Sequence, residues 1–176
     1  MIDYFKAIVP LEVGKSWTSS SDIEFVESSN IATGECYSSN ATYNNLKLRV
    51  TANRAFVSGS IHKYLIGNNY SDFTLSNYRC ALDLLGHELG INWQHTTLTS
   101  FEFGVNITPS VPVSKVLEKY LEYSSNPFGK MKGGVCSEAS QYRIKAYDKG
   151  AQAQLAKELM RYEVHTKKMQ FLKRKG

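Results

Sequence analysis

Short segments in which polar and apolar residues alternate are the feature that most constrains the fold of this chain. Clear examples are Leu46–Val50, residues 97–108, Tyr142–Asp148 and residues 159–166. Side chains two positions apart on a β-strand point to the same face, so each segment predicts a strand with one polar and one apolar face. Strands of this kind are typical of antiparallel sheets that are covered on one face only.

Fewer segments carry the signals of a helix. One helix is expected to begin after Asp72 or Thr74 and to run to Leu89, where Gly90 can end it. A second is expected over residues 112–123, with a proline in its first turn. The predicted fold class is α+β, a largely antiparallel sheet with helices packed on one face and a polar catalytic face opposite. The other expected elements are strands in residues 2–13, 22–27 and 55–65, a short helix or long turn over 151–158, and a basic helix over 167–175.

Length and composition indicate a folded protein with a polyanionic partner. The 176 residues fit a single domain over residues 1–176, and 42% hydrophobic against 21% charged residues allows a buried core. The net charge of +5 suits nucleic acid, although many soluble proteins reach such a charge without that partner. The sequence shows no signal that ends the basic helix expected over residues 167–175, so we expect the chain to be truncated at its C-terminus.

The cysteines and the N-terminus predict a compartment. Cys36, Cys80 and Cys136 lie far apart without a CxxC pair, which indicates neither a disulfide framework nor a zinc site. The N-terminus lacks the basic and apolar regions of a signal peptide, and no apolar run is long enough to cross a membrane. These features predict a cytoplasmic protein without a membrane partner.

A tyrosine surrounded by cations is the strongest chemical pattern. In the strand expected at Tyr142–Asp148, the side chains of Arg143, Lys145, Tyr147 and Lys149 would share one face. Cations at this spacing neutralise a phosphodiester and favour the phenolate, as a tyrosine that attacks phosphate requires. The alternative is an ordinary edge strand with a solvated basic face.

Two acidic residues in neighbouring strands predict a metal site. Glu102 lies between two phenylalanines, and a carboxylate buried there needs a partner or a metal. Glu163, with His165 two residues later, offers a second carboxylate and a third ligand or an acid/base group. Such oxygen ligands suit Mg²⁺ or Mn²⁺. The alternatives are a solvent-facing Glu102 and a surface ion pair between Glu163 and Arg161.

The chain resembles the rolling-circle replication initiators of filamentous phages and related plasmids. The likeness lies in a series of short blocks in the same order along most of the chain. They are Met1-Ile2-Asp3, the lysine-then-Gly-Asn-Asn block within residues 62–69, the acidic strand at residues 101–107, the Tyr-x-Lys block at residues 146–149 and the Leu-x-Arg-Tyr-Glu block at residues 159–164.

The resemblance implies roles for individual residues. Tyr147 would be the nucleophile, Lys149 a helper on the phosphate side, and Glu102 and Glu163 the metal carboxylates. His62 or Lys63 would lie near the site. Two departures from the family pattern are the glutamate at 102, where an aspartate is commoner, and the missing His-hydrophobic-His pair of better-known relaxases, so the metal site would be led by carboxylates.

These arguments predict a metal-dependent, site-specific enzyme that nicks and joins one DNA strand through a 5′-phosphotyrosine intermediate. The expected partner is single-stranded or hairpin origin DNA, with a host helicase as a candidate. One alternative is a non-catalytic basic DNA-binding module, and another is a metal nuclease that uses water in place of tyrosine. The expected DNA-binding residues are Arg143, Lys145, His62, Lys63, Asn69, Lys167, Lys168, Lys173 and Arg174.

Overall fold

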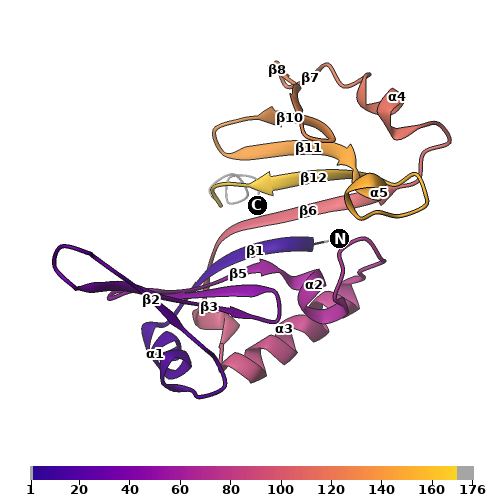
Figure 1. Ribbon diagram of the computed structural model, residues 1–176. Coiled ribbons are helices and arrows are strands. Elements are labelled where there is room, and N and C mark those ends of the chain that lie inside the picture. Colours follow the sequence, from indigo (N-terminus) through magenta and orange to yellow (C-terminus); the bar gives the residue numbers. More distant parts are fainter. Residues whose placement is uncertain (1, 170–176) are drawn as a thin grey trace. The chain divides into compact units, whose positions relative to one another are not determined.

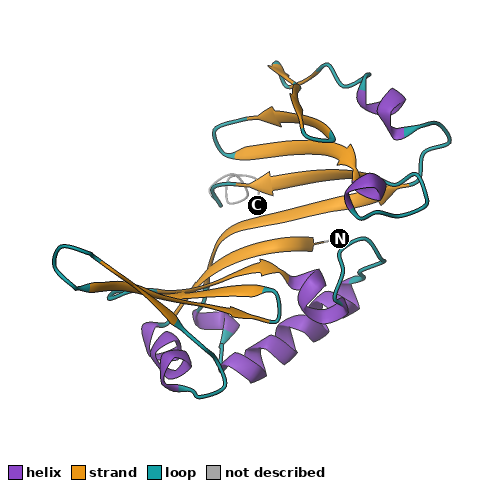
Figure 2. Cartoon of the chain, in the orientation of Figure 1, coloured by secondary structure: helices purple, strands orange, loops and turns teal. Residues whose placement is uncertain are grey.

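The computed structural model describes residues 2–169, which form two compact units. The C-terminal unit comprises residues 100–169 with residues 2 and 70–72, and the N-terminal unit comprises residues 3–69 and 73–99. Each unit contains an antiparallel sheet together with helices (Figure 2), so the predicted α+β fold class is confirmed, whereas the single-domain organisation stays a prediction. None of the described helices has both the length and the apolar character needed to span a bilayer.

The N-terminal unit is an antiparallel sheet with the strand order β2-β3-β4-β5-β1. Helices lie on one side of this sheet, as Figure 1 shows. Its core comes from the inward faces of the strands, where the side chains of Phe5, Leu46, Leu48 and Val57 are almost fully buried. The elements are β1 (Ile2–Val9), α1 (Leu11–Ser19), β2 (Val26–Ser29), β3 (Cys36–Tyr43), β4 (Leu46–Val50), β5 (Ala55–Ser60), α2 (Ile61–Ile66), α3 (Leu75–Leu89) and the 3-10 turn η1 (Trp93–His95).

Helix α3 begins and ends where the sequence predicts. The Thr74 hydroxyl accepts a hydrogen bond from the backbone N–H of Asn77, whose side chain in turn accepts one from the Thr74 N–H. This reciprocal pair satisfies two donors that the first turn would leave free. Gly90 ends the helix in the left-handed conformation, with φ of 64°. The buried face is formed by Ala81, Leu85 and Leu89.

Several expectations for the N-terminal unit are wrong. Helix α1 and strand β3 are not predicted by the sequence, and the strand expected at residues 22–27 begins only at Val26. The strand expected over residues 55–65 ends at Ser60, because the Ser60 hydroxyl caps a new helix by accepting a hydrogen bond from the Lys63 N–H. A serine at this position stabilises a helix start, and the alternating pattern before it obscured that signal.

The C-terminal unit is an antiparallel sheet with the strand order β6-β12-β11-β10-β9. Helix α4 packs on β10 and β11, and α5 packs on β12. The small hairpin β7–β8 forms a separate two-stranded sheet that contacts β10, where the Ser137 hydroxyl donates a hydrogen bond to the Asn126 oxygen. The elements are β6 (Thr97–Ile107, in this unit from Ser100 onward), α4 (Val113–Leu117), β7 (Glu122–Tyr123), β8 (Asn126–Pro127), β9 (Gly129–Met131), β10 (Gly134–Glu138), β11 (Tyr142–Asp148), α5 (Lys149–Gln152) and β12 (Met160–Thr166).

The helix expected over residues 112–123 is also wrong in length. It ends at Leu117, and of its expected apolar face only Val113 is buried, whereas Leu121 is exposed. Strands β8 and β9 are not predicted by the sequence, because they are too short to show an alternating pattern. Of the basic helix expected over residues 167–175, residues 170–176 lie outside the described part of the chain.

The apolar face of β6 is not covered in the way that the sequence predicts. Phe103, Val105 and Ile107 are 37%, 49% and 39% exposed, and the rings of Phe101 and Phe103 stack with centroids 5.4 Å apart. The opposite face of the same strand buries Glu102. The polar face, rather than the apolar one, is therefore the more enclosed side of β6.

Candidate active site

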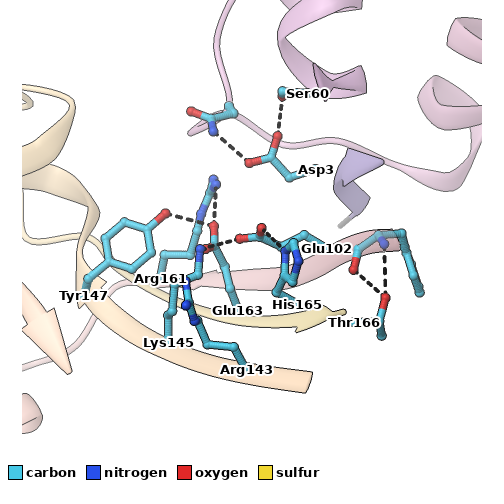
Figure 3. Close-up of polar contacts among 12 residues, drawn as sticks. Asp3, Ser60, Glu102, Arg143, Lys145, Tyr147, Arg161, Glu163, His165 and Thr166 are labelled. Carbon is cyan, nitrogen blue, oxygen red and sulfur yellow. Dashed lines mark hydrogen bonds and ion pairs between the residues drawn. The ribbon is translucent and has the colours of Figure 1, made fainter. Parts of the chain in front are cut away.

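Polar side chains from β6, β11 and β12 meet on one face of the C-terminal sheet. The register sets Glu163 of β12 between Lys145 of β11 and Gly104 of β6. It also places His165 opposite Glu102. Because alternate residues share a face, these side chains point the same way, as Figure 3 shows. We call Glu102, Lys145, Tyr147, Arg161, Glu163 and His165 the polar cluster.

The Tyr147 phenol contacts the cluster through Glu163. Its hydroxyl donates a 2.8 Å hydrogen bond to Glu163 Oε1. The same oxygen lies 3.3 Å from Nη1 of Arg161, whose side chain is fully buried. Arg161 is held in turn by a 2.8 Å hydrogen bond from its Nε to Asn106 Oδ1. The pairing of Arg161 with Glu163 is therefore buried rather than at the surface, and Arg161 belongs to the polar cluster.

Lys145 lies between the two carboxylates. Its ammonium nitrogen is 2.6 Å from Glu102 Oε1 and 2.6 Å from Glu163 Oε2. The lysine side chain is 20% exposed, and that of Glu163 only 3%. Because little water reaches these groups, the Lys145 ammonium stabilises the carboxylate charges that water would otherwise solvate. The residue expected to contact DNA thus acts inside the cluster, where it holds two acidic groups together.

The two carboxylates differ in their protonation. Burial alone would raise the pKa of Glu102, but hydrogen bonding with Glu163 and the charge of Lys145 outweigh it and hold this pKa at about 2. Burial and the neighbouring Glu102 raise the pKa of Glu163 above its usual value. A proton that binds to the pair therefore resides on Glu163, which is also the carboxylate in contact with Tyr147.

The tyrosine itself is strongly biased toward its neutral form. Burial and the negative charge of Glu163 raise the pKa of the Tyr147 phenol well above its ordinary value, and Arg161 opposes this shift only in part. The side chain is 8% exposed. Attack on a phosphate would therefore require a base, and Glu163 is the group in hydrogen-bonding contact with the phenol.

His165 closes the cluster on the side away from Tyr147. Its Nε2 lies 3.2 Å from the Ser100 hydroxyl, which donates its own hydrogen to the backbone oxygen of Thr166 at 2.7 Å. The other ring nitrogen, Nδ1, lies 3.0 Å from Glu102 Oε2, so the ring bridges Ser100 and Glu102.

The cluster can offer two ligands to a divalent cation. Within residues 2–169, no three His, Cys, Asp or Glu side chains are already arranged as a ligand group. However, Glu102 and Glu163 each place one oxygen 2.6 Å from the same ammonium, so the two oxygens can approach one cation together. Carboxylate oxygens are the donors that Mg²⁺ and Mn²⁺ prefer, and the pair therefore fits such an ion if Lys145 moves aside.

The chain was compared with protein families, with curated sequences and with solved structures, and the solved structures include one of similar fold. No protein-family model matches the chain, and no curated protein matches its sequence. In fold, the chain resembles a rolling-circle replication initiator. This is the rolling circle replication initiator protein from Geobacillus stearothermophilus, matched with a TM-score of 0.57 over 96% of this chain and 74% of that chain. The sequence identity is 9%, so the likeness is one of fold.

Three predicted DNA contacts lie in the N-terminal unit. His62 is fully buried, and its ring stacks on Phe73 with centroids 4.4 Å apart. Lys63 is exposed on α2. Asn69 donates a 2.7 Å hydrogen bond to Asp3 Oδ2. Burial therefore gives His62 a packing role in this structure, and contact between these residues and DNA stays a prediction.

Asp3 is a residue that the sequence analysis did not single out. Its carboxylate is 7% exposed and accepts hydrogen bonds from the Asn69 amide and the Ser60 hydroxyl. A buried carboxylate is uncommon unless it has a structural or functional role. The Met1-Ile2-Asp3 block was the signal that could have identified it.

The remaining predicted residues that the structure describes lie outside the polar cluster, some buried and some at the surface. Lys149 does not continue the strand face of Tyr147, because the chain enters α5 at that residue, where Lys149 is buried and donates to Gln152 Oε1 at 2.8 Å. Arg143 and Lys167 both pair with Glu138 near the surface. Lys168 is exposed, and the predicted contacts Lys173 and Arg174 lie outside the described residues.

Proposed function

We propose that this chain nicks and rejoins a single DNA strand at a specific site and so initiates rolling-circle replication, with Tyr147 as the nucleophile. The observation that carries the proposal is the hydrogen bond from the Tyr147 hydroxyl to Glu163, within a polar cluster that also contains a second carboxylate and two cations. The fold likeness to a rolling circle replication initiator supports it. Recognition of a specific DNA site and a helicase partner stay predictions.

In the proposed reaction, Glu163 takes the phenolic proton as the Tyr147 oxygen attacks the phosphorus. The bond from phosphorus to the 3′-oxygen breaks, and that oxygen leaves with a proton from solvent as a 3′-hydroxyl. The 5′-phosphate stays esterified to Tyr147. Reversal of the same steps rejoins the strand, because the phosphotyrosine ester retains the energy of the original phosphodiester.

The charges of the cluster suit this chemistry. The fully buried Arg161 favours the phenolate through its positive charge, which acts strongly where water is excluded. Glu102 and Glu163 would hold Mg²⁺ or Mn²⁺, which would polarise the phosphate and offset the charge that grows on it. Lys145 would then be free to contact the phosphate. The exposed Arg143 and Lys168 would add attraction to the DNA backbone that weakens with salt.

A non-catalytic DNA-binding module is the second candidate. It is favoured by the burial of Tyr147 and by the raised pKa of its phenol, both of which oppose formation of a phenolate. In this case the polar cluster would stabilise the sheet, and only the exposed basic residues would bind DNA. The two candidates differ in one observable, the covalent bond between protein and DNA.

The test is a search for that bond. The protein is incubated with Mn²⁺ and a random single-stranded DNA library, and the products are separated on a denaturing gel and sequenced. We expect a slower protein band that carries DNA with one common junction. Tyr147→Phe should abolish this band, whereas Tyr142→Phe, a change on the opposite face of the same strand, should retain it. DNA binding without any covalent band in the wild type would favour the binding module, and nicked DNA without a band would favour water as the nucleophile.

A further inference from the structure

A pocket of about 430 Å³ lies beside Tyr147 on the C-terminal unit. It is bounded by the tip of the β9–β10 hairpin, the end of β11 and the short helix α5. Its volume falls in the range of pockets that hold small molecules, roughly 300–1,000 Å³. The lining residues are Met131, Lys132, Gly133, Lys145, Tyr147, Asp148, Ala151 and Gln152.

The hairpin tip is fixed against the strand that carries the tyrosine. Met131 pairs with Gly134, so Lys132 and Gly133 form a two-residue connection. Gly133 adopts a left-handed backbone with φ of 73°, which glycine tolerates without strain. The backbone N–H of Asp148 donates a 3.0 Å hydrogen bond to the Gly133 oxygen. Lys132 is therefore carried on a rigid turn rather than on a free loop.

Close packing under the tyrosine also fixes the wall of the pocket. Gly134 lies directly opposite Tyr147 in the register. A Cβ atom at position 134 would lie 2.5 Å from the Tyr147 Cβ, closer than any side chain allows. The absence of a side chain at position 134 thus lets β10 approach β11, and it keeps the hairpin tip next to the phenol.

Lys132 supplies the charge that the pocket can offer to a ligand. Its side chain is exposed, and within residues 2–169 it has no ion-pair partner. Lys145 is instead engaged by two carboxylates. Asp148 also lines the pocket, and its Oδ1 accepts a 2.8 Å hydrogen bond from the Ala151 N–H, which fixes this carboxylate at the start of α5. Lys132 is therefore the cation at the pocket that remains open to an anionic ligand.

We propose that this pocket binds the nucleotide whose 5′-phosphate Tyr147 attacks, with Lys132 in contact with that phosphate. The inference rests on the proposed function for the identity of the ligand. An attacked phosphorus must come within about 3–3.5 Å of the phenolic oxygen, so the attached nucleotide must lie beside the tyrosine. The apolar surfaces of Met131 and Ala151 suit a base or sugar, and the Gln152 amide suits the polar edge of a base.

The experiment uses two lysines of the same hairpin. Lys132→Gln removes the charge at the pocket, and Lys130→Gln removes an exposed charge two residues earlier on β9, outside the pocket. Binding of a deoxynucleoside 5′-monophosphate to the full chain is measured by calorimetry at low salt. We expect Lys132→Gln to weaken binding on the order of tenfold, as the loss of a hydrogen bond to a charged group implies, and Lys130→Gln to bind as the wild type does.

The same variants are then compared in the formation of the covalent DNA adduct. We expect Lys132→Gln to raise the KM for the oligonucleotide while it still forms the adduct, because Tyr147 and Glu163 are intact. Equal mononucleotide affinity in Lys132→Gln and the wild type would overturn the pocket assignment, as would an absence of binding by the wild type at millimolar ligand. A wild type that binds the mononucleotide but forms no adduct would refute the proposed function and leave the nucleotide pocket standing.

Discussion

Gly104 lies directly opposite Glu163, and the room for the glutamate side chain depends on the glycine having none. A Cβ at position 104 would be 2.4 Å from the Tyr162 oxygen and 3.0 Å from the Glu163 Cγ. We expect Gly104→Ala to push β6 and β12 apart locally and to lower the free energy of unfolding by about 1–3 kcal/mol, as overpacking usually does. Urea denaturation measures this loss.

A second glycine in the same sheet provides the control. At Gly129 in β9 the nearest atom to an added Cβ is the Cys136 oxygen at 3.9 Å, an ordinary contact. Gly129→Ala should therefore leave stability within about 0.5 kcal/mol of the wild type. If the two variants lose the same stability, the close approach of Gly104 to Glu163 does not explain the loss in Gly104→Ala.

Three of the C-terminal strands, β6, β11 and β12, could be predicted because each has its own alternating pattern. Tyr142–Asp148 and the strand ending at Thr166 were correct almost to the residue, since burial on one face repeats every second position. The helix expected over residues 112–123 failed for the opposite reason. Its apolar residues fit a helical period, but after Leu117 the chain turns into the β7–β8 hairpin, which only tertiary contacts decide.

The candidate site was predictable in its residue types but not in its contacts. Glu102 stood out because its carboxylate lies between two phenylalanines, and Tyr147 stood out because cations flank it at alternate positions. The position of Lys145 between two carboxylates depends on the register of three strands, which no local pattern encodes. For the same reason Arg161 could not be distinguished from an exposed arginine, although its guanidinium is fully buried.

Removal of the central cation should destabilise the sheet. Lys145→Met leaves Glu102 and Glu163 facing each other without their shared ammonium, and we expect a loss of about 3–5 kcal/mol at neutral pH. The deficit should shrink as the pH falls, because protonation then removes the repulsion between the carboxylates. The double variant Lys145→Met/Glu102→Gln should recover part of the stability at neutral pH. A deficit that stays constant between pH 4 and pH 7 would contradict this account.

Arg161 should not tolerate replacement by lysine. Its Nε binds Asn106 and its Nη1 faces Glu163, and a single ammonium cannot reproduce this fork. We expect Arg161→Lys to lower the free energy of unfolding by about 1–3 kcal/mol. Arg143→Lys, at the exposed start of β11, should change it by less than about 0.5 kcal/mol in the same denaturation assay. Comparable losses in the two variants would argue against the buried fork.

The phenol of Tyr147 should ionise only at high pH, and the negative charge of Glu163 should be one cause of its raised pKa. Because the folded pKa is raised, the protonated phenol stabilises the fold below about pH 10, and this contribution is lost as the pH rises through the folded pKa. Ultraviolet titration follows the ionisation of the phenols, and the step that belongs to Tyr147 is the one absent from Tyr147→Phe. In Glu163→Gln, which lacks the negative charge, this step should move to lower pH. Glu138→Gln should not move it. An unchanged step in Glu163→Gln would contradict the coupling of these two groups.

A divalent cation should stabilise the folded chain through the two carboxylates. At a concentration one hundred times its Kd, Mn²⁺ that binds only the folded state adds about 2.7 kcal/mol, which raises the Tm measurably. We expect this shift to disappear in Glu102→Gln and in Glu163→Gln, and to persist in Glu138→Gln, whose carboxylate pairs near the surface with Arg143. Lys145→Met should show a larger shift than the wild type, because the ammonium no longer competes for the same oxygens. A shift that survives both carboxylate changes would place the cation elsewhere.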